Sequence, residues 1–314
     1  MKLFNHSIPV EIIYVLSIIY SVLILSSLIF WLISLTKKNK LLTELIVRVN
    51  SWWKIVIGVT LVITCPPIVG TVIIAYVSFV SLREMFSIGR MRASDRIALF
   101  LAYLSIPVQY YLAYNNYYEQ FLYFIPLIIF MSIAIVLVLS GQTKRIGRSM
   151  SVIPTMVMLT VYMLSHLVLF FNIETPYFSA GGYGLIIFII MITAFNDVFQ
   201  FTWGKLLGKH KILPTVSPNK TWEGFIGGIL TTSALAFGLK FLTPLNSYEA
   251  LLTGLIVGIV GFLGDSLISA IKRDLNLKDT DDLIPGHGGA LDRLDSIILT
   301  APIFYHLLRY FVVN

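Results

Sequence analysis

Six aspartates stand close together in KRDLNLKDTDDLIPGHGGALDRLD, the stretch that spans residues 272–295. Asp292 and Asp295 are three residues apart, so at the start of a helix both carboxylates would lie on one face. Paired oxygen ligands suit Mg²⁺, which takes one or two carboxylates together with substrate phosphates. We therefore predict that Asp292 and Asp295 bind a metal, and we expect no more than a supporting role for the other four aspartates.

The segment just before this stretch adds groups that suit the same chemistry. In GDSLISAIKR, Asp265, Ser269 and Lys272 follow the spacing i, i+4, i+7, so they share one helix face. A carboxylate and a cation on one face suit a phosphate that is bound to a metal ion. The glycines of PGHGG, residues 285–289, would let backbone N–H groups approach an anion closely.

Two upstream segments place polar residues in or beside apolar runs. Asn196 and Asp197 lie inside an apolar run, where a carboxylate is by default a functional candidate; the alternative is a packing hydrogen bond to another helix. The sequence GKHKILPTVSPNKTWEG, residues 208–224, places cations and hydroxyls before a helix that starts near Trp222, as in many phosphate sites. The alternative here is a basic loop that touches lipid headgroups.

Membrane helices must position these residues. Of the 314 residues, 57% are hydrophobic and 12% are charged, and the mean hydropathy is +0.85, which lies far outside the range of soluble proteins. The net charge of +7 fits the basic loops of membrane proteins, so we expect no nucleic-acid partner. A single cysteine, Cys65, allows no intrachain disulfide, and the scattered histidines suggest no zinc site.

Apolar runs long enough to cross a bilayer as helices predict an all-α, polytopic integral membrane protein. These runs are residues 12–35, 97–114, 121–140, 152–171, 184–204, 223–243, 250–271 and 294–312. A further stretch, residues 55–82, is broken by Pro66-Pro67 and has basic residues on both sides, so it should cross an even number of times. We interpret it as a short Pro-broken pair, either a thin hairpin or a re-entrant pair, which makes about ten crossings in all.

The distribution of charge predicts sidedness and a division of the chain. With ten crossings, nearly all Lys and Arg residues fall in loops on one side of the membrane, which we assign to the cytoplasm. Both termini should then lie on the other side, outside the cell. We expect the membrane to be a bacterial cell membrane. Because polar residues enter the spans only after about residue 180, we predict an N-terminal transmembrane region, 1–180, and a C-terminal catalytic transmembrane region, 181–314, with cytoplasmic loops at 205–222 and 272–294.

Carboxylates for a divalent cation, with Lys and Arg for phosphates, would thus meet at the cytoplasmic membrane surface. This combination favours metal-assisted phosphoryl or nucleotidyl transfer to a lipid. Residue spacing alone does not identify the substrate.

The run SAIKRDLNLKDTDDLIPGHGGALDRLD, residues 269–295, resembles the signature of the phosphatidate cytidylyltransferases, the CDP-diacylglycerol synthases. Asn196-Asp197 followed by SPNKTWEGFIGG is similar to the upstream motif of that family, and SLREMF, residues 81–86, to a further short element. The resemblance covers about residues 180–300 and is specific there. It implies that CTP and phosphatidate react at the bilayer to give CDP-diacylglycerol and pyrophosphate, with Mg²⁺ as cofactor, and it leaves a homodimer open.

The resemblance also implies roles for individual residues. Asp265, Asp292 and Asp295 match the metal-binding acids and, with Lys272 and Arg273, form the catalytic set. The implied substrate-binding residues are Asn196, Asp197, Ser217, Lys220, Ser269, His287, Gly288, Gly289 and Arg293.

Departures from the family pattern leave room for a divergent paralogue with a different lipid or nucleotide preference. Asp281 stands where the signature usually has a small residue, and Ile268 where many members carry Glu. Two other functions stay open. One is a CTP-dependent lipid-alcohol kinase of the dolichol-kinase kind, which releases CDP instead of pyrophosphate. The other is a transporter that uses Asn196-Asp197 as an ion site.

Overall fold

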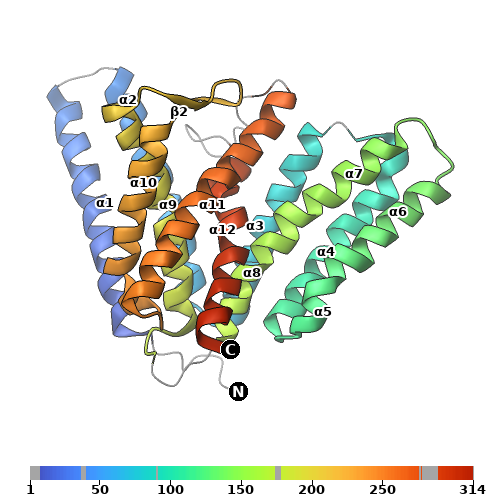
Figure 1. Ribbon diagram of the computed structural model, residues 1–314, viewed down its shortest axis with the longest axis horizontal. Coiled ribbons are helices and arrows are strands. Elements are labelled where there is room, and N and C mark those ends of the chain that lie inside the picture. The colour runs from blue at the N-terminus through green and yellow to red at the C-terminus, as the bar shows by residue number, and fades with distance from the viewer. Residues whose placement is uncertain are drawn as a thin grey trace.

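The computed structural model describes residues 8–36, 40–89, 91–173, 178–275, 277 and 289–313. This part of the chain is almost entirely helical (Figure 1), which confirms the all-α fold class. Its α-helices are α1 (Val10–Thr36), α2 (Lys40–Thr64), α3 (Pro67–Ile88), α4 (Arg96–Tyr114), α5 (Tyr118–Tyr123), α6 (Phe130–Leu139), α7 (Ile146–Val157), α8 (Met163–Leu169), α9 (Gly181–Leu207), α10 (Trp222–Gly238), α11 (Ser247–Asp274) and α12 (Leu291–Leu308). Short 3₁₀-helices are η1 (Ala93–Asp95), η4 (Phe170–Asn172) and η5 (Lys240–Leu242), and π-helices are η2 (Phe124–Ile129), η3 (Met158–Tyr162) and η6 (Arg309–Val313).

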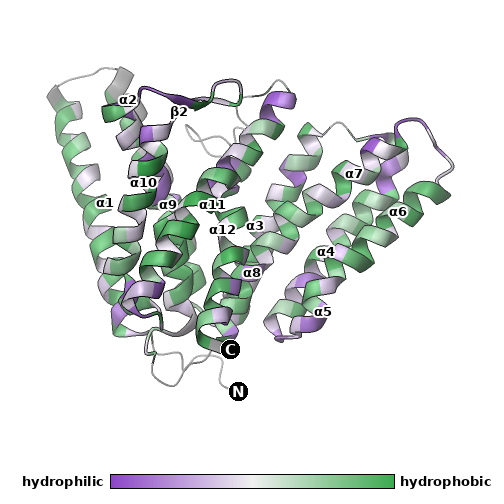
Figure 2. Ribbon diagram, in the orientation of Figure 1, coloured by the Kyte–Doolittle hydropathy of each residue, from purple (hydrophilic) through white to green (hydrophobic). Residues whose placement is uncertain are grey.

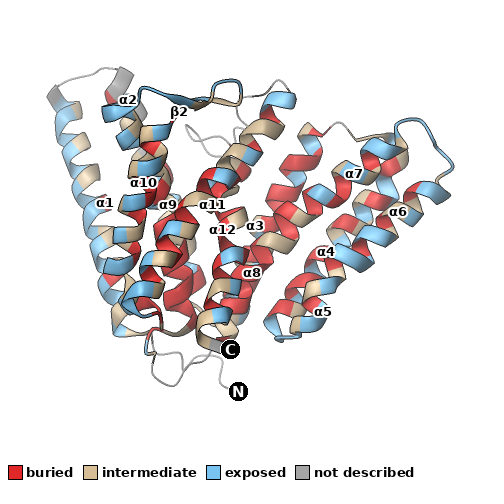
Figure 3. Ribbon diagram, viewed as in Figure 1, coloured by how far each residue is buried: buried red, intermediate tan, exposed pale blue. Residues whose placement is uncertain are grey.

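Eight helical segments among the described residues are long and apolar enough to cross a membrane. The helices α10 and α12 are shorter or more polar, but they pack against α9 and α11 and run alongside them (Figure 1). The outward faces of the helices are apolar and exposed (Figures 2 and 3). In the most apolar 18-residue stretch of α1, only 17% is buried inside the protein. An apolar surface of this extent needs lipid around it, so the chain is an integral membrane protein.

The Pro-broken pair is longer than the sequence predicted. Pro66 and Pro67 do separate two helices, but α2 begins at Lys40 and has 25 residues. The predicted Pro-broken pair near residues 55–82 is confirmed, but its first helix is longer than expected, because α2 starts well before the apolar run. Most of the added residues belong to a segment, Leu45–Thr64, that is itself apolar enough to cross a membrane. Among them, the Trp53 indole N–H donates to Ser27 Oγ of α1 at 2.9 Å.

Residues 205–222, predicted as a cytoplasmic loop, include an antiparallel β-hairpin. Its strands β1 (Lys211–Leu213) and β2 (Ser217–Thr221) lead directly into α10. Thr221 caps α10, since its hydroxyl oxygen accepts the Gly224 N–H at 3.2 Å. Glu223 in the first turn of α10 binds the His210 imidazole at 2.6 Å. These contacts hold the hairpin against the end of α10, so that β2 has a defined direction.

Close helix contacts at glycine bring α9, α10, α11 and α12 together. A Cβ atom on Gly224 of α10 would lie 2.6 Å from the Gln200 carbonyl oxygen of α9. A Cβ atom on Gly264 of α11 would lie 2.5 Å from the Asp295 carbonyl oxygen of α12. Any side chain at these positions would push the helices apart. The glycine at 264 therefore lets the neighbouring Asp265 approach the first turns of α12.

The helix α12 connects this group of helices to the earlier part of the chain. It packs against α11 and α9 on one side and against α8 and α3 on the other. The described starts of α12 and α7 and the described end of α3 all lie at the end of the molecule that carries the hairpin (Figure 1). Residues from both parts of the chain can therefore meet at that end.

Candidate active site

The carboxylate of Asp265 on α11 is held by two side chains. The Ser269 hydroxyl, one turn later on the same helix, donates to Asp265 Oδ1 at 3.1 Å, as the i, i+4 spacing predicts. The Lys220 ammonium forms an ion pair with Asp265 Oδ2 at 2.9 Å. Lys220 comes from β2, so the hairpin brings a cation over the carboxylate of α11.

The Lys220 side chain reaches well into the bundle. Its Nζ donates to the Phe262 carbonyl oxygen at 3.2 Å and to Ser266 Oγ at 2.9 Å, and it lies 4.3 Å from the centre of the Phe262 ring. The ammonium is thus satisfied by oxygen acceptors and by the negative face of the ring. The Lys220 ammonium therefore has a defined position beside Asp265, whereas a lysine in a solvated loop would not.

A second lysine and carboxylate pair joins α11 to α12. Lys272 Nζ lies 2.6 Å from Asp292 Oδ1, and both side chains are nearly buried. The other carboxylate oxygen of Asp292 accepts the Gly289 N–H at 3.1 Å. Charge-assisted bonds of this length are among the stronger polar contacts in proteins, so Asp292 and Lys272 have a fixed relative position.

Ser296 bridges the carboxylates of Asp197 and Asp295. The Ser296 hydroxyl donates to the Asp197 carboxylate at 3.0 Å from Oδ2, and the Ser296 N–H donates to Asp295 Oδ1 at 2.8 Å. Asp265 interacts electrostatically with both of these carboxylates. Three acids from α9, α11 and α12 therefore share one region, where each adds to the negative potential felt by the others.

Glu84 of α3 holds the start of α12, a role that the sequence analysis missed. Its two carboxylate oxygens accept the N–H groups of Ala290 at 2.8 Å and of Leu291 at 2.9 Å. The side chain is 3% exposed. A carboxylate at a helix N-terminus accepts hydrogen bonds from the free N–H groups and interacts favourably with the positive end of the helix dipole. The signal that could have indicated it was the short element SLREMF, residues 81–86, which contains this acid.

Asn196 is placed differently from its neighbour Asp197. Its amide nitrogen donates to the Gly258 carbonyl oxygen of α11 at 3.2 Å, and its amide oxygen accepts from Thr232 of α10 at 3.0 Å. The residue is fully buried. Asn196 thus joins three helices, which is the packing role that the sequence left open, whereas Asp197 faces the carboxylate region.

The remaining predicted site residues lie around this centre. Arg273 donates to the carbonyl oxygens of Val216 and Leu277, at 3.3 and 2.9 Å, and so contacts the hairpin turn. Ser217 pairs with Leu213 in the hairpin, and Arg293 is exposed in the first turn of α12. The predicted residues His287 and Gly288 lie outside the described residues.

The donor set fits Mg²⁺ only together with a substrate. Within the described ranges, no three His, Cys, Asp or Glu side chains are arranged so that they could hold a metal ion by themselves. Mg²⁺ commonly binds through one or two carboxylates plus substrate phosphates, with water completing its shell. The carboxylates of Asp265, Asp292 and Asp295 supply suitable oxygen atoms, and two lysines nearby supply cations for phosphate.

The fold and the site define a polytopic membrane protein with a carboxylate- and lysine-lined polar site at one end of its helix bundle. The profile of the cytidylyltransferase family matches residues 46–311. The chain therefore belongs to the cytidylyltransferase family.

Similar proteins fall into two groups. The uncharacterized protein YnbB of Escherichia coli (strain K12) is 40% identical over 299 residues, which cover 94% of this chain and 97% of that protein. Phosphatidate cytidylyltransferase of Staphylococcus haemolyticus is 38% identical over 146 residues, or 45% of this chain and 56% of that enzyme. The corresponding enzyme of Staphylococcus aureus (strain COL) is 38% identical over 129 residues, or 40% of this chain. The match thus spans about half the length of these named enzymes.

Proposed function

We propose that this protein condenses CTP with phosphatidate to give CDP-diacylglycerol and pyrophosphate. The observation that carries the proposal is the meeting of Asp197, Asp265 and Asp295 with Lys220 beside them at one end of an apolar bundle. Such a site suits a reaction between two phosphate compounds, one of which has its acyl chains in the bilayer. The staphylococcal relatives, which are named phosphatidate cytidylyltransferases, support the same substrates. By the basic-loop rule, we assign this end to the cytoplasm, where CTP is found.

The proposed chemistry is a single displacement at phosphorus. An oxygen of the phosphatidate phosphate attacks the α-phosphorus of CTP and forms a new P–O–P linkage. The bond from the α-phosphorus to the oxygen that bridges to the β-phosphate breaks, and pyrophosphate leaves with that electron pair. No covalent enzyme intermediate is needed, because positioning and charge neutralisation can lower the barrier.

Each group of residues has a proposed part in this step. Asp265, Asp292 and Asp295 would hold Mg²⁺, which when bound supplies positive charge to the reacting phosphates. Lys220 and Lys272 now contact Asp265 and Asp292, and a triphosphate would offer their ammonium groups competing oxygen acceptors. Glu84 touches backbone N–H groups of α12 and acts as a positioning residue.

The test is a product assay with purified protein, CTP, phosphatidate and Mg²⁺. We expect both a CDP-lipid and pyrophosphate, and we expect both to disappear when a chelator removes the metal. Release of CDP with a phosphorylated lipid alcohol would instead support the kinase alternative. A protein that is folded but releases none of these products would contradict the proposal.

A matched pair of variants on α11 tests the assignment of the site. Asp265→Asn should lower turnover by about 100-fold or more, because Asp265 is a proposed Mg²⁺ ligand and a neutral amide would hold the cation more weakly. Asp274→Asn is the control, since Asp274 is exposed at the end of the same helix, and it should leave turnover within about twofold. Equal effects of the two substitutions would sink the assignment of Asp265.

A further inference from the structure

A second polar site lies apart from the carboxylate region, where the end of α3, the η1 helix and the start of α7 meet. A small cavity there is lined by three arginines, Arg92, Arg145 and Arg148, together with Gly89 and Ser149. The end of α3 and the start of α7, which line it, lie at the same end of the bundle as the hairpin and the start of α12 (Figure 1). The carboxylate site is built from α9, α11, α12 and the hairpin, so this cavity belongs to a different part of the fold.

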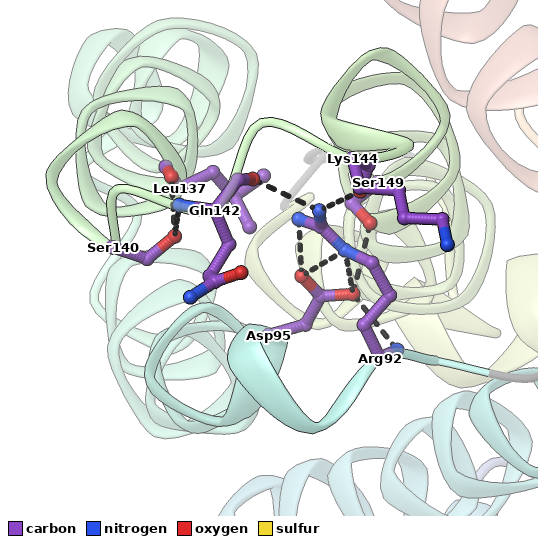
Figure 4. A network of polar contacts seen from close by, with 7 residues as sticks. All are labelled: Arg92, Asp95, Leu137, Ser140, Gln142, Lys144 and Ser149. Carbon is purple, nitrogen blue, oxygen red and sulfur yellow. Dashed lines mark hydrogen bonds and ion pairs between the residues drawn. The ribbon is translucent and has the colours of Figure 1, made fainter.

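One wall of the cavity is a fixed polar network (Figure 4). Arg92 forms an ion pair with Asp95 at 2.7 Å and also donates to the carbonyl oxygens of Gln142 and Lys144 in the loop before α7. The Ser149 hydroxyl of α7 donates to the other oxygen of Asp95 at 2.8 Å. Asp95 is fully buried. The network neutralises the charge of Arg92 and ties η1 to the start of α7.

The other two arginines keep most of their donors available. Arg148 donates one hydrogen bond, from Nη2 to the Gly89 carbonyl oxygen at 3.2 Å. Arg145 forms no ion pair or hydrogen bond through its side chain with the described part of the chain, and both side chains are exposed. No side chain caps the start of α7. Because Asp95 already neutralises Arg92, the cavity has an excess of two positive charges.

We propose that this cavity binds the phosphate of an anionic phospholipid from the surrounding bilayer. A guanidinium presents several donors in one plane and suits phosphate oxygens well. Basic pockets between membrane helices, at the level of the headgroups, are typical places for such lipids. Met91 and Val152 also line the cavity, so its wall is partly apolar, and the exposed surface of the adjacent helices offers a place for acyl chains. The cavity is too small for a whole nucleotide, so we expect only a phosphate group to lie against its arginines.

Lipid binding can be measured without CTP, so the result is independent of the proposed reaction. Purified protein in detergent is titrated with phosphatidylglycerol, phosphatidylcholine or inorganic phosphate, and bound lipid is counted by native mass spectrometry while the melting temperature is followed. We expect phosphatidylglycerol to bind and to raise the melting temperature. The double substitution Arg145→Gln/Arg148→Gln should weaken this binding by about 30-fold, since two cations near the headgroup are lost.

The control variant removes the same amount of charge at the same end of the bundle. Arg83→Gln/Arg96→Gln alters two exposed arginines that do not line the cavity, and it should change the affinity by no more than about threefold. If the double variant of Arg145 and Arg148 does not fold, each single substitution should still weaken binding by about fivefold. Equal losses in the two double variants, unchanged binding after loss of Arg145 and Arg148, or an equal response to inorganic phosphate would each overturn the proposal.

Discussion

The substitution Glu84→Gln tests how the N-terminal part of the chain supports the site. Glu84 is 3% exposed, and its carboxylate accepts the N–H groups of Ala290 and Leu291. A glutamine of the same shape has one amide oxygen, which can accept one of these bonds. Its NH₂ group would then face the other N–H group, donor against donor.

The expected cost follows from these contacts. A hydrogen bond to a charged group contributes about 1.5–3 kcal/mol, and a carboxylate at a helix N-terminus adds about 0.3–1 kcal/mol. With one neutral bond retained, we expect the start of α12 to be destabilised by about 3 kcal/mol. This corresponds to local opening of the first turn of α12 that is about 150-fold more frequent.

Hydrogen exchange at the amides of Ala290 and Leu291 measures this directly. In Glu84→Gln we expect these amides to exchange about 100-fold faster than in the wild type, while amides in the middle of α12 change far less. Glu119→Gln is the matched control, because Glu119 is exposed in the first turn of α5. Exchange at Ala290 and Leu291 within about threefold of the control variant would refute the reasoning.

Two further predictions concern packing around the site. Lys272→Met removes the ion-pair partner of Asp292, whose side chain is 5% exposed, and should lower the free energy of unfolding by denaturant by about 3 kcal/mol. Adding Asp292→Leu should recover most of this loss, and a double variant that recovers none of it would contradict the prediction. Gly224→Ala would place a methyl group 2.6 Å from the Gln200 carbonyl oxygen and should cost about 1–3 kcal/mol. Gly238→Ala, with open space around it, should instead stabilise by about 0.5 kcal/mol, and melting temperatures that shift equally would contradict this difference.

The helical membrane fold could be predicted because its signal is local. A bilayer requires about 20 apolar residues for each crossing, and a helix satisfies its own backbone hydrogen bonds. The length of α2 could not be predicted in this way, because its first half lies outside the apolar run and packs against α1, for example through the hydrogen bond from Trp53 to Ser27. The hairpin at 211–221 was missed for a similar reason, since its short strands have no clear alternating pattern.

The candidate site was predicted in part. Lys272, Asp292 and Asp265 belong to motifs in which the spacing itself carries information, and the structure brings them close to partners of opposite charge. Asn196 and Asp197 are adjacent in sequence, yet one joins helices and the other faces the acids. Successive residues of a helix point about 100° apart, and the packing of α9 decides which of them faces the site.

The sequence by itself determined that this chain is a polytopic helical membrane protein, and it placed the acidic and basic residues of the candidate site in recognisable motifs. Only the tertiary structure decided which of these groups meet. Lys220 reaches Asp265 because the hairpin directs it there, and Glu84 holds residues more than 200 positions away. The physical reason is that spacing specifies neighbours within a helix, whereas contacts between helices depend on glycine approach and side-chain packing across the whole bundle.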